Sequence, residues 1–190
     1  MTTDLRATLE TIRALANDHM QNLDPRDDDW IVLADMLDHA GAPDRAVRDR
    51  IVMTVFNLTR DTTISNYQPV RGSVSPSAPP LYLNVHLRFA ANFTGERYGD
   101  GLAALSRLIG FFQQTPYFTR GTAPGLPPEI DRIAVEFENL SLADVREVTD
   151  MLGTPYRPSV FYKLRMLPFA AAGMPGPAYP INELPRPTPA

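Results

Sequence analysis

The chain has 190 residues, of which 44% are hydrophobic and 21% charged, values typical of one globular domain with a full apolar core. Its formal net charge of −4 argues against a general nucleic-acid binder, and its lack of cysteine excludes disulfides, thiolate nucleophiles and thiolate metal sites. Residues 1–10 have neither a basic start nor an apolar stretch, and no apolar run could span a bilayer. We therefore expect a cytoplasmic protein without a secretion signal or membrane span.

The first third of the chain predicts a helix followed by strands. Apolar residues over 5–20 recur at three- and four-residue spacing, which predicts an amphipathic helix. The acidic stretch 24–29 predicts a solvated turn, because the spaced ligands and distal glutamate of a calcium loop are missing. Residues 30–37 fit a short strand or a short helix, with the strand favoured. Residues 50–59 are apolar on both faces and rich in β-branched side chains, as in an interior strand.

The rest of the chain alternates strands and helices. Leucine, valine and phenylalanine alternate with polar residues from Leu81 to Phe89, which is the clearest strand pattern in the sequence. Ser141 and Asp144 are spaced for a capping box at the start of a helix that Gly153 would end. The predicted elements are a loop over 66–80, a strand over 81–89, a helix over 98–112, a loop over 117–128, a strand over 133–137, a helix over 142–152 and a strand over 156–167.

This order predicts the fold class and the division of the chain. It favours one α/β (α+β) domain over residues 1–167, with a single mixed or antiparallel sheet of about four or five strands flanked by helices. Seven of the 19 prolines lie between Pro168 and Pro189, so residues 168–190 are expected to form an extended Pro-rich arm. Such an arm could lie across a neighbour and add a strand to a sheet edge through Tyr179 to Leu184.

The sequence lacks the familiar motifs of catalytic and cofactor sites. It has no dinucleotide fingerprint, no phosphate-binding loop and no nucleophile elbow. Its three histidines lie in different predicted elements, and none has a second ligand at metal-binding spacing, so we expect no metal and no cofactor. An enzyme built on this chain would have to use His86 or the pair Glu136 and Glu138. A solvated or interface-facing strand surface is the simpler interpretation of these side chains.

Three segments resemble a known family in their order and spacing. They are residues 79–93 (PPLYLNVHLRFAANF), residues 105–119 (LSRLIGFFQQTPYFT) and residues 133–167, which contain FENLSLADVREVTDMLGTPYRPSVFYKLRML. The chain resembles the cap, or tail-terminator, family of extracellular contractile injection systems over residues 51–167. The similarity includes the pattern Leu-Gly-x-x-Tyr-x-Pro-Ser-Val-x-Tyr at residues 152–162.

The resemblance implies a tail-terminator-like fold and a structural subunit without enzymatic activity. Such a subunit would form a homo-oligomeric, hexameric ring on the last layers of an inner tube and a sheath, and would end the growth of both. Its partners would be further copies of itself, the inner-tube protein and the sheath protein, with no nucleic acid. It would assemble in the cytoplasm and then form part of a phage-tail-like particle. The alternatives are a baseplate or sheath-associated adaptor of the same machine, a generic binding adaptor, and a small hydrolase using His86.

A closed ring needs two different faces on each subunit, because its contacts are heterologous. The two predicted loops, 66–80 and 117–128, are the candidates for these contacts. The candidate interface residues are Tyr67, Arg71, Arg88, Tyr117, Arg120, Arg157, Lys163, Tyr179 and Leu184.

Overall fold

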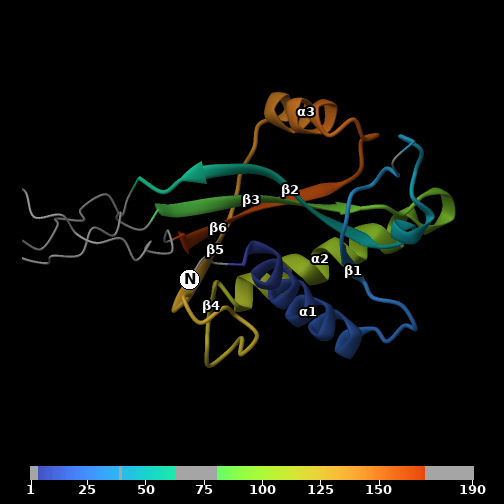
Figure 1. Ribbon diagram of the computed structural model, residues 1–190. Helices are drawn as coiled ribbons and strands as arrows, with labels where there is room; N and C mark the ends of the chain where they lie inside the picture. Colours follow the sequence, from blue (N-terminus) through green and yellow to red (C-terminus); the bar gives the residue numbers. More distant parts are fainter. Residues whose placement is uncertain (1–3, 39, 63–80, 170–190) are drawn as a thin grey trace, which may run out of the picture.

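A computed structural model describes residues 4–38, 40–62 and 81–169 of the chain (Figure 1). A twisted sheet runs through the middle of the molecule, and helices cover it on both sides. The elements in chain order are α1 (Leu5–Leu23), β1 (Ile31–Leu33), the short 3₁₀ helix η1 (Arg45–Val47), β2 (Ile51–Arg60), β3 (Leu81–Ala91), η2 (Gly95–Arg97), α2 (Tyr98–Gln114), β4 (Tyr117–Thr119), β5 (Arg132–Phe137), α3 (Leu142–Met151) and β6 (Ser159–Phe169).

The sheet of the described residues has six strands in the order β1-β2-β3-β6-β5-β4. Strands β1 and β2 pair in parallel, and every other neighbouring pair is antiparallel. The last strand, β6, therefore lies in the middle of the sheet, between β3 and β5. Strand β1 covers only the first three residues of β2, so no described strand pairs with the outer edge of β2 from Val55 to Arg60. The sheet thus has two unlike ends, β1 with the free part of β2 at one and β4 at the other.

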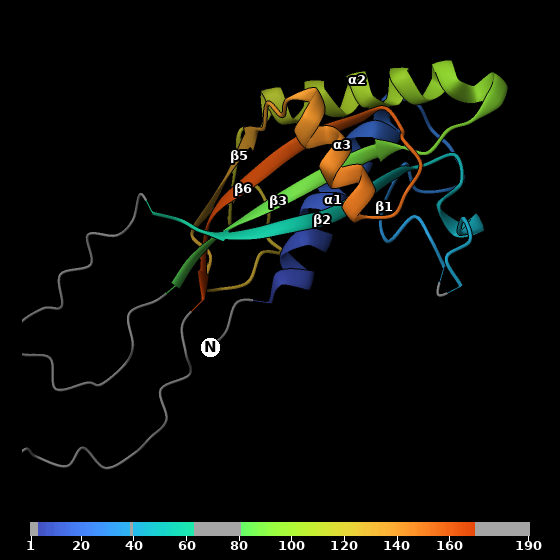
Figure 2. The same cartoon turned by 90° about the horizontal axis from the view of Figure 1, so that it is seen from above.

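Helices α1 and α2 lie on one face of the sheet, and α3 lies on the opposite face, as the two views in Figures 1 and 2 show. We call the face under α1 and α2 the inner face and the face under α3 the outer face. Phe89 is fully buried on the inner face, with its ring centroid 5.4 Å from that of Phe112 on α2 and 5.9 Å from that of Tyr162 on β6. The main hydrophobic core is therefore the layer between the inner face and these two helices.

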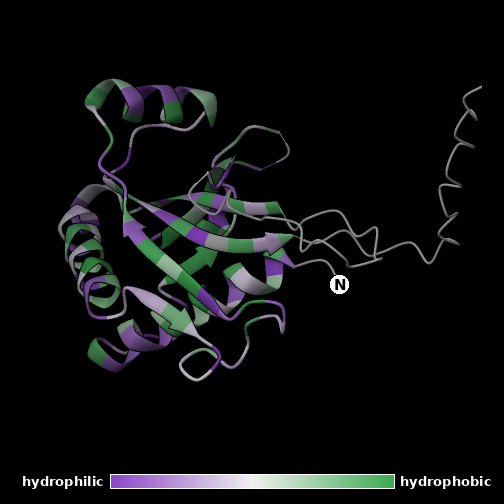
Figure 3. Ribbon diagram, turned by 90° about the vertical axis from the view of Figure 1, so that its left-hand side faces the viewer, coloured by the Kyte–Doolittle hydropathy of each residue, from purple (hydrophilic) through white to green (hydrophobic). Residues whose placement is uncertain are grey.

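Local sequence explains why the helices begin and face as they do. On α1 the residues Leu9, Ile12, Ala16 and Met20 are almost fully buried, which confirms the predicted apolar stripe. At the start of α3, the Ser141 hydroxyl accepts a hydrogen bond from the Asp144 N–H and the Asp144 carboxylate accepts one from the Ser141 N–H, as the spacing predicted. Gly153 follows the helix with a φ of 62°, a conformation that favours glycine. Hydrophobic and hydrophilic residues alternate along the strands (Figure 3).

The predicted fold class is confirmed, and one short strand, β4, raises the number from the five predicted strands to six. Residues 30–37 contain the strand that was favoured, but only Ile31–Leu33 pair. Strand β4 lies within 117–128, which the Gly/Pro content predicted to be a loop, because a three-residue strand is too short to show alternation. Strand β6 continues through Pro168 and Phe169, the first two residues of the predicted arm. The predicted loop 66–80 and the rest of the arm, 170–190, lie outside the described residues.

Candidate functional surfaces

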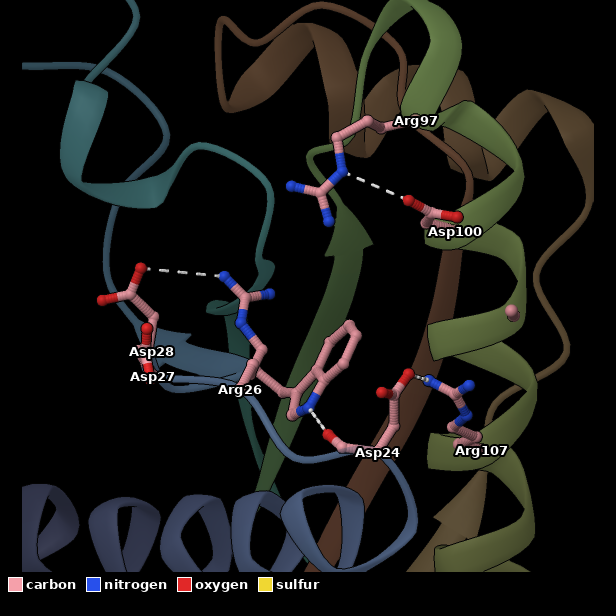
Figure 4. A pocket seen from close by; sticks show the side chains of 9 residues that line it. Asp24, Arg26, Asp27, Asp28, Arg97, Asp100 and Arg107 are labelled. Atoms are coloured by element: carbon pink, nitrogen blue, oxygen red, sulfur yellow. Dashed lines mark hydrogen bonds and ion pairs between the residues drawn. The ribbon is translucent and has the colours of Figure 1, made fainter.

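A charged hollow of about 430 Å³ opens between the end of α1 and the side of α2 (Figure 4). Trp30 lies at its base, where the indole N–H donates to the Asp24 carbonyl at 2.9 Å. The guanidinium of Arg26 lies 4.7 Å and that of Arg107 5.5 Å from the indole centroid, which places two cations on the ring. The lining residues are Asp24, Arg26, Asp27, Asp28, Trp30, Arg97, Asp100, Ala103 and Arg107.

The positive charges of this hollow are already paired. Arg107 lies 2.8 Å from the Asp24 carboxylate, and Arg97 lies 3.1 Å from Asp49 and 3.2 Å from Asp100. The acidic stretch 24–29 is an exposed turn, as predicted, but it is also tied to arginines distant in the sequence. The hollow therefore holds a network of ion pairs, with four aspartates and three arginines in its lining.

His86 links three segments on the outer face of the sheet. Its Nε2 lies 2.8 Å from the Thr59 hydroxyl on β2, and its Nδ1 lies 2.9 Å from the Glu138 carboxylate just after β5. Hydroxyl, imidazole and carboxylate stand in the order that nucleophilic catalysis uses for nucleophile, base and orienting acid. The alternation over 81–89 predicted that His86 lies on the polar face of a strand. It could not predict the partners Thr59 and Glu138, because they belong to other segments.

The surroundings of His86 do not fit a hydrolase. A hollow of about 410 Å³ beside it is lined by His86 and Glu138 but not by Thr59, so the hydroxyl does not face the space where a substrate would lie. Asp144 and Glu147 add two more carboxylates to the same lining, and these would repel the oxyanion of an acyl-transfer intermediate. We interpret the three side chains as a clamp that joins β2 and β3 to the end of β5.

The pair Glu136 and Glu138 is divided between two networks on the outer face. Glu136 accepts from Arg165 at 2.8 Å and lies 3.1 Å from the Lys163 ammonium. Burial acts to raise the pKa of Glu136, but the hydrogen bonds from Arg165 and Lys163 outweigh it and lower that pKa. Arg165 also lies 3.3 Å from Asp61, whose side chain is 1% exposed. Glu136 is therefore ion-paired and Glu138 is hydrogen-bonded to His86, so the two glutamates do not form an acid/base couple.

The structure separates the candidate interface residues into several places. Tyr117 is half-exposed on β4 under the guanidinium of Arg132, 4.3 Å from its ring centroid, and exposed Arg120 lies close by in sequence and pairs with Asp131. Lys163 is in the network with Glu136, on the outer face. Tyr67, Arg71, Tyr179 and Leu184 lie outside the described residues.

Arg88 and Arg157 lie on the outer face near the start of β6. Arg157 is partly exposed and donates to Asn92. The prediction of Arg88 as an interface residue assumes an accessible side chain. In the single chain, however, Arg88 is only 1% exposed. The alternation of side chains along β3 places Arg88 on the outer face, where the connection from α3 to β6 covers it. There it donates to the hydroxyls of Thr154 and Ser159.

Several large apolar side chains are exposed on and around α3. Leu142 is 91% and Met151 64% exposed on the helix itself, and Tyr156 is 67% exposed just after it. Only Val148 and Thr149 of α3 are buried. The helix predicted over 142–152 is present, and it leaves apolar surface free, as interaction surfaces do.

Among the described residues, no three or more His, Cys, Asp or Glu side chains are grouped as a metal site would require. None of the described helices is long and apolar enough to cross a membrane.

The fold is shared with solved terminators of contractile injection systems. The sheath/tube terminator of PVC, an extracellular contractile injection system, in its extended state is similar with a TM-score of 0.62 at 12% identity, over 100% of this chain and 65% of that one. The tube-terminating cap of the anti-feeding prophage is similar with a TM-score of 0.56 at 9% identity, over 98% of this chain and 62% of that one. The chain thus spans less than two thirds of either protein. No curated protein matches the sequence.

The family follows from the sequence itself. The model of the Pvc16 N-terminal domain matches residues 7–183, which is nearly the whole chain. The chain belongs to the Pvc16 N-terminal domain family. The predicted membership in a tail-terminator family of contractile injection systems is thereby confirmed.

Proposed function

We propose that the chain is a non-enzymatic cap, or tail terminator, of a contractile injection system. The observation that carries the proposal is the fold shared with two such terminators over almost the entire chain, together with the family match. The described surfaces agree with a structural role, because the arginines of the hollow between α1 and α2 are ion-paired and no hydroxyl lines the hollow beside His86. The proposed partners are the inner-tube protein and the sheath protein of the same particle.

We further propose that the subunit works as a hexameric ring. A ring closes when each subunit offers two different surfaces to its neighbours, and the two ends of this sheet are chemically unlike. The β4 end carries Tyr117, Arg120 and Arg132, whereas the β2 end offers backbone groups from Val55 to Arg60 that no described strand uses. A ring of this kind would take the last tube layer on one side and present no matching surface on the other, and polymerisation would stop there.

The predicted arm, residues 168–190, would serve the same assembly by crossing to an adjacent subunit, a tube subunit or a sheath subunit. Its proline content limits the conformational freedom that is lost on docking. The free edge of β2 offers unused backbone donors and acceptors for an added strand, which Tyr179 to Leu184 could supply. In this proposal the particle assembles in the cytoplasm, and the loop with Tyr67 and Arg71 contributes to the ring contacts.

The deciding experiment is the assembly of tubes and sheaths from their purified proteins with and without this chain. We expect a defined length distribution and a cap at one end when the chain is present, and uncontrolled lengths when it is absent. Electron micrographs of particles that contain a labelled chain show at which end of the particle the chain lies. A label at the baseplate end would replace the cap by the adaptor alternative, and unchanged lengths in the absence of the chain would refute the cap.

A further inference from the structure

Arg88 is a buried cation that has no counter-ion among the described residues. It projects from β3 on the outer face, is 1% exposed, and is among the largest fully buried side chains of the described residues. Its Nε donates to the Ser159 hydroxyl at 3.0 Å and its Nη1 to the Thr154 hydroxyl at 2.9 Å. Its Nη2 is buried and has no hydrogen-bond partner among the described residues. Both groups that it contacts are neutral, so its charge is solvated only by two hydroxyl dipoles.

The electrostatic surroundings add to this imbalance. No described carboxylate forms an ion pair with Arg88, whereas Arg26, Arg50 and Arg97 each have one. Burial lowers the pKa of Arg88, and the positive charge of Arg157 lowers it further. A guanidinium nevertheless stays protonated in proteins, so it cannot escape the penalty by losing its proton. An unpaired buried charge carries a large desolvation cost, which a bound anion would offset.

One short segment covers Arg88 on the outer face. It is the connection 153–158, which starts at Gly153 with a positive φ and exposes Pro155 and Tyr156. Helix α3, which precedes it, buries only two residues. A small displacement of this connection would bring Nη2 to the surface without disturbing the inner core, which lies on the other side of the sheet.

We propose that Arg88, together with the hydroxyls of Thr154 and Ser159 and flanked by Arg157, is a receptor for a carboxylate. A planar carboxylate matches the fork of a guanidinium and would engage the donor that is now idle. The carboxylate is either a free small acid or an aspartate or glutamate of a neighbouring protein in the cap. The second source rests on the proposed function, whereas the first does not. The chain carries 22 acidic against 18 basic residues, so a further copy has carboxylates to spare.

The first arm of the test uses the full chain alone, with acetate as the probe. Thermal unfolding is compared in sodium acetate and sodium chloride at equal ionic strength and pH. We expect acetate to raise the midpoint of the wild-type chain by about 2–4 °C and to leave Arg88→Met unchanged. Arg146→Met is the matched control, because Arg146 is 83% exposed on α3 and should keep the full acetate effect. An equal acetate response of the wild type and Arg88→Met refutes the receptor. Loss of the acetate response in both Arg88→Met and Arg146→Met refutes it as well.

Arg88→Met should fold, because methionine fills a similar volume and removes a buried charge that lacks a partner. Arg88→Gln is a second variant that keeps hydrogen-bond donors and loses only the charge, and it should behave in the same way. If acetate protects Arg88→Gln as it protects the wild type, acetate binding does not need the positive charge of Arg88, and the proposal fails.

The second arm distinguishes the two sources of the carboxylate. Ring and particle assembly are measured for Arg88→Met and Arg146→Met beside the wild type. A loss of rings with Arg88→Met alone assigns the carboxylate to a neighbouring subunit or tube protein. Normal rings combined with the acetate effect on the isolated chain assign it to a free acid. If the wild-type chain does not cap tubes at all, the proposed function fails, and the acetate result still decides the receptor.

Discussion

Polar side chains, most of them only partly buried, tie the strands together at the residue scale. His86 lies between Thr59 and Glu138, and Arg165 between Glu136 and Asp61, so each side chain connects segments distant in the sequence. A buried group that loses such a partner pays its full desolvation cost, which is why these positions tolerate substitution poorly. On the inner face the corresponding constraint is steric, since aromatic rings from α2 and β6 contact Phe89 directly.

Tyr162 gives a prediction at this scale. Burial raises the pKa of its phenol to about 12, so the folded protein favours the neutral form. The resulting stabilisation is fully present below the unfolded pKa of about 10 and is lost as the pH rises through about 12. We expect Tyr162 to ionise late in a titration that follows tyrosinate absorbance, and Tyr162→Phe to remove only the late component.

At the scale of single elements, α3 differs from the other two helices. Helices α1 and α2 are fixed by rows of buried apolar residues, whereas α3 buries only Val148 and Thr149 and depends on its own capping box. Elements with few buried contacts open at lower free energy than the core. We therefore expect α3 to be the first helix to open, and this is the property that a surface which adapts to partners requires.

Ser141→Ala tests the dependence of α3 on its cap. Loss of the hydroxyl should destabilise the helix by about 1 kcal/mol and speed amide hydrogen exchange from Leu142 to Met151. Ser106→Ala is the control, because Ser106 is exposed on α2 and its hydroxyl bonds only to a carbonyl of its own helix. Its effect should stay within about 0.5 kcal/mol. Equal exchange in α3 of both variants would contradict the proposed dependence on the cap.

The same cap makes α3 sensitive to acid. Hydrogen bonds from the Ser141 hydroxyl and N–H lower the pKa of the Asp144 carboxyl. A depressed folded-state pKa stabilises the helix above the unfolded pKa, and this contribution is lost as the pH falls through the folded value. Protection factors in α3, which correct for the pH dependence of intrinsic exchange, should therefore fall on acidification in the wild type, and Asp144→Asn should remove that dependence.

Much of the architecture could be predicted at the scale of the whole molecule, since it follows from local patterns. The alternation over 81–89 and the Ser141 and Asp144 spacing are local, and both predictions are confirmed. The contacts of the candidate surfaces are not local: Arg165 and Asp61 are 104 positions apart, and the cover over Arg88 comes from the chain 66 positions further on. A period along one strand indicates which face a side chain takes, but not what covers that face.

The arm gives the prediction at this scale. A chain that lacks residues 174–190 should keep its fold, because the six described strands end at Phe169, and should lose ring or particle assembly. Tyr179→Ala combined with Leu184→Ala should reproduce the defect within the full-length chain, and Thr188→Ala is the matched control. Circular dichroism measures folding, and electron micrographs measure particle length. Particles of normal length from the truncated chain would refute a role for the arm.

The place of β6 has a consequence for how the protein is made. The strand that leaves the ribosome last is the one that joins β3 to β5, so until it emerges the sheet consists of two halves with no bond between them. Pairing between such distant parts of a chain is slow and comes late in folding. A nascent or prematurely terminated polypeptide therefore lacks a continuous sheet of the described strands. Under the proposed function, only subunits whose synthesis has passed Phe169 would enter a particle.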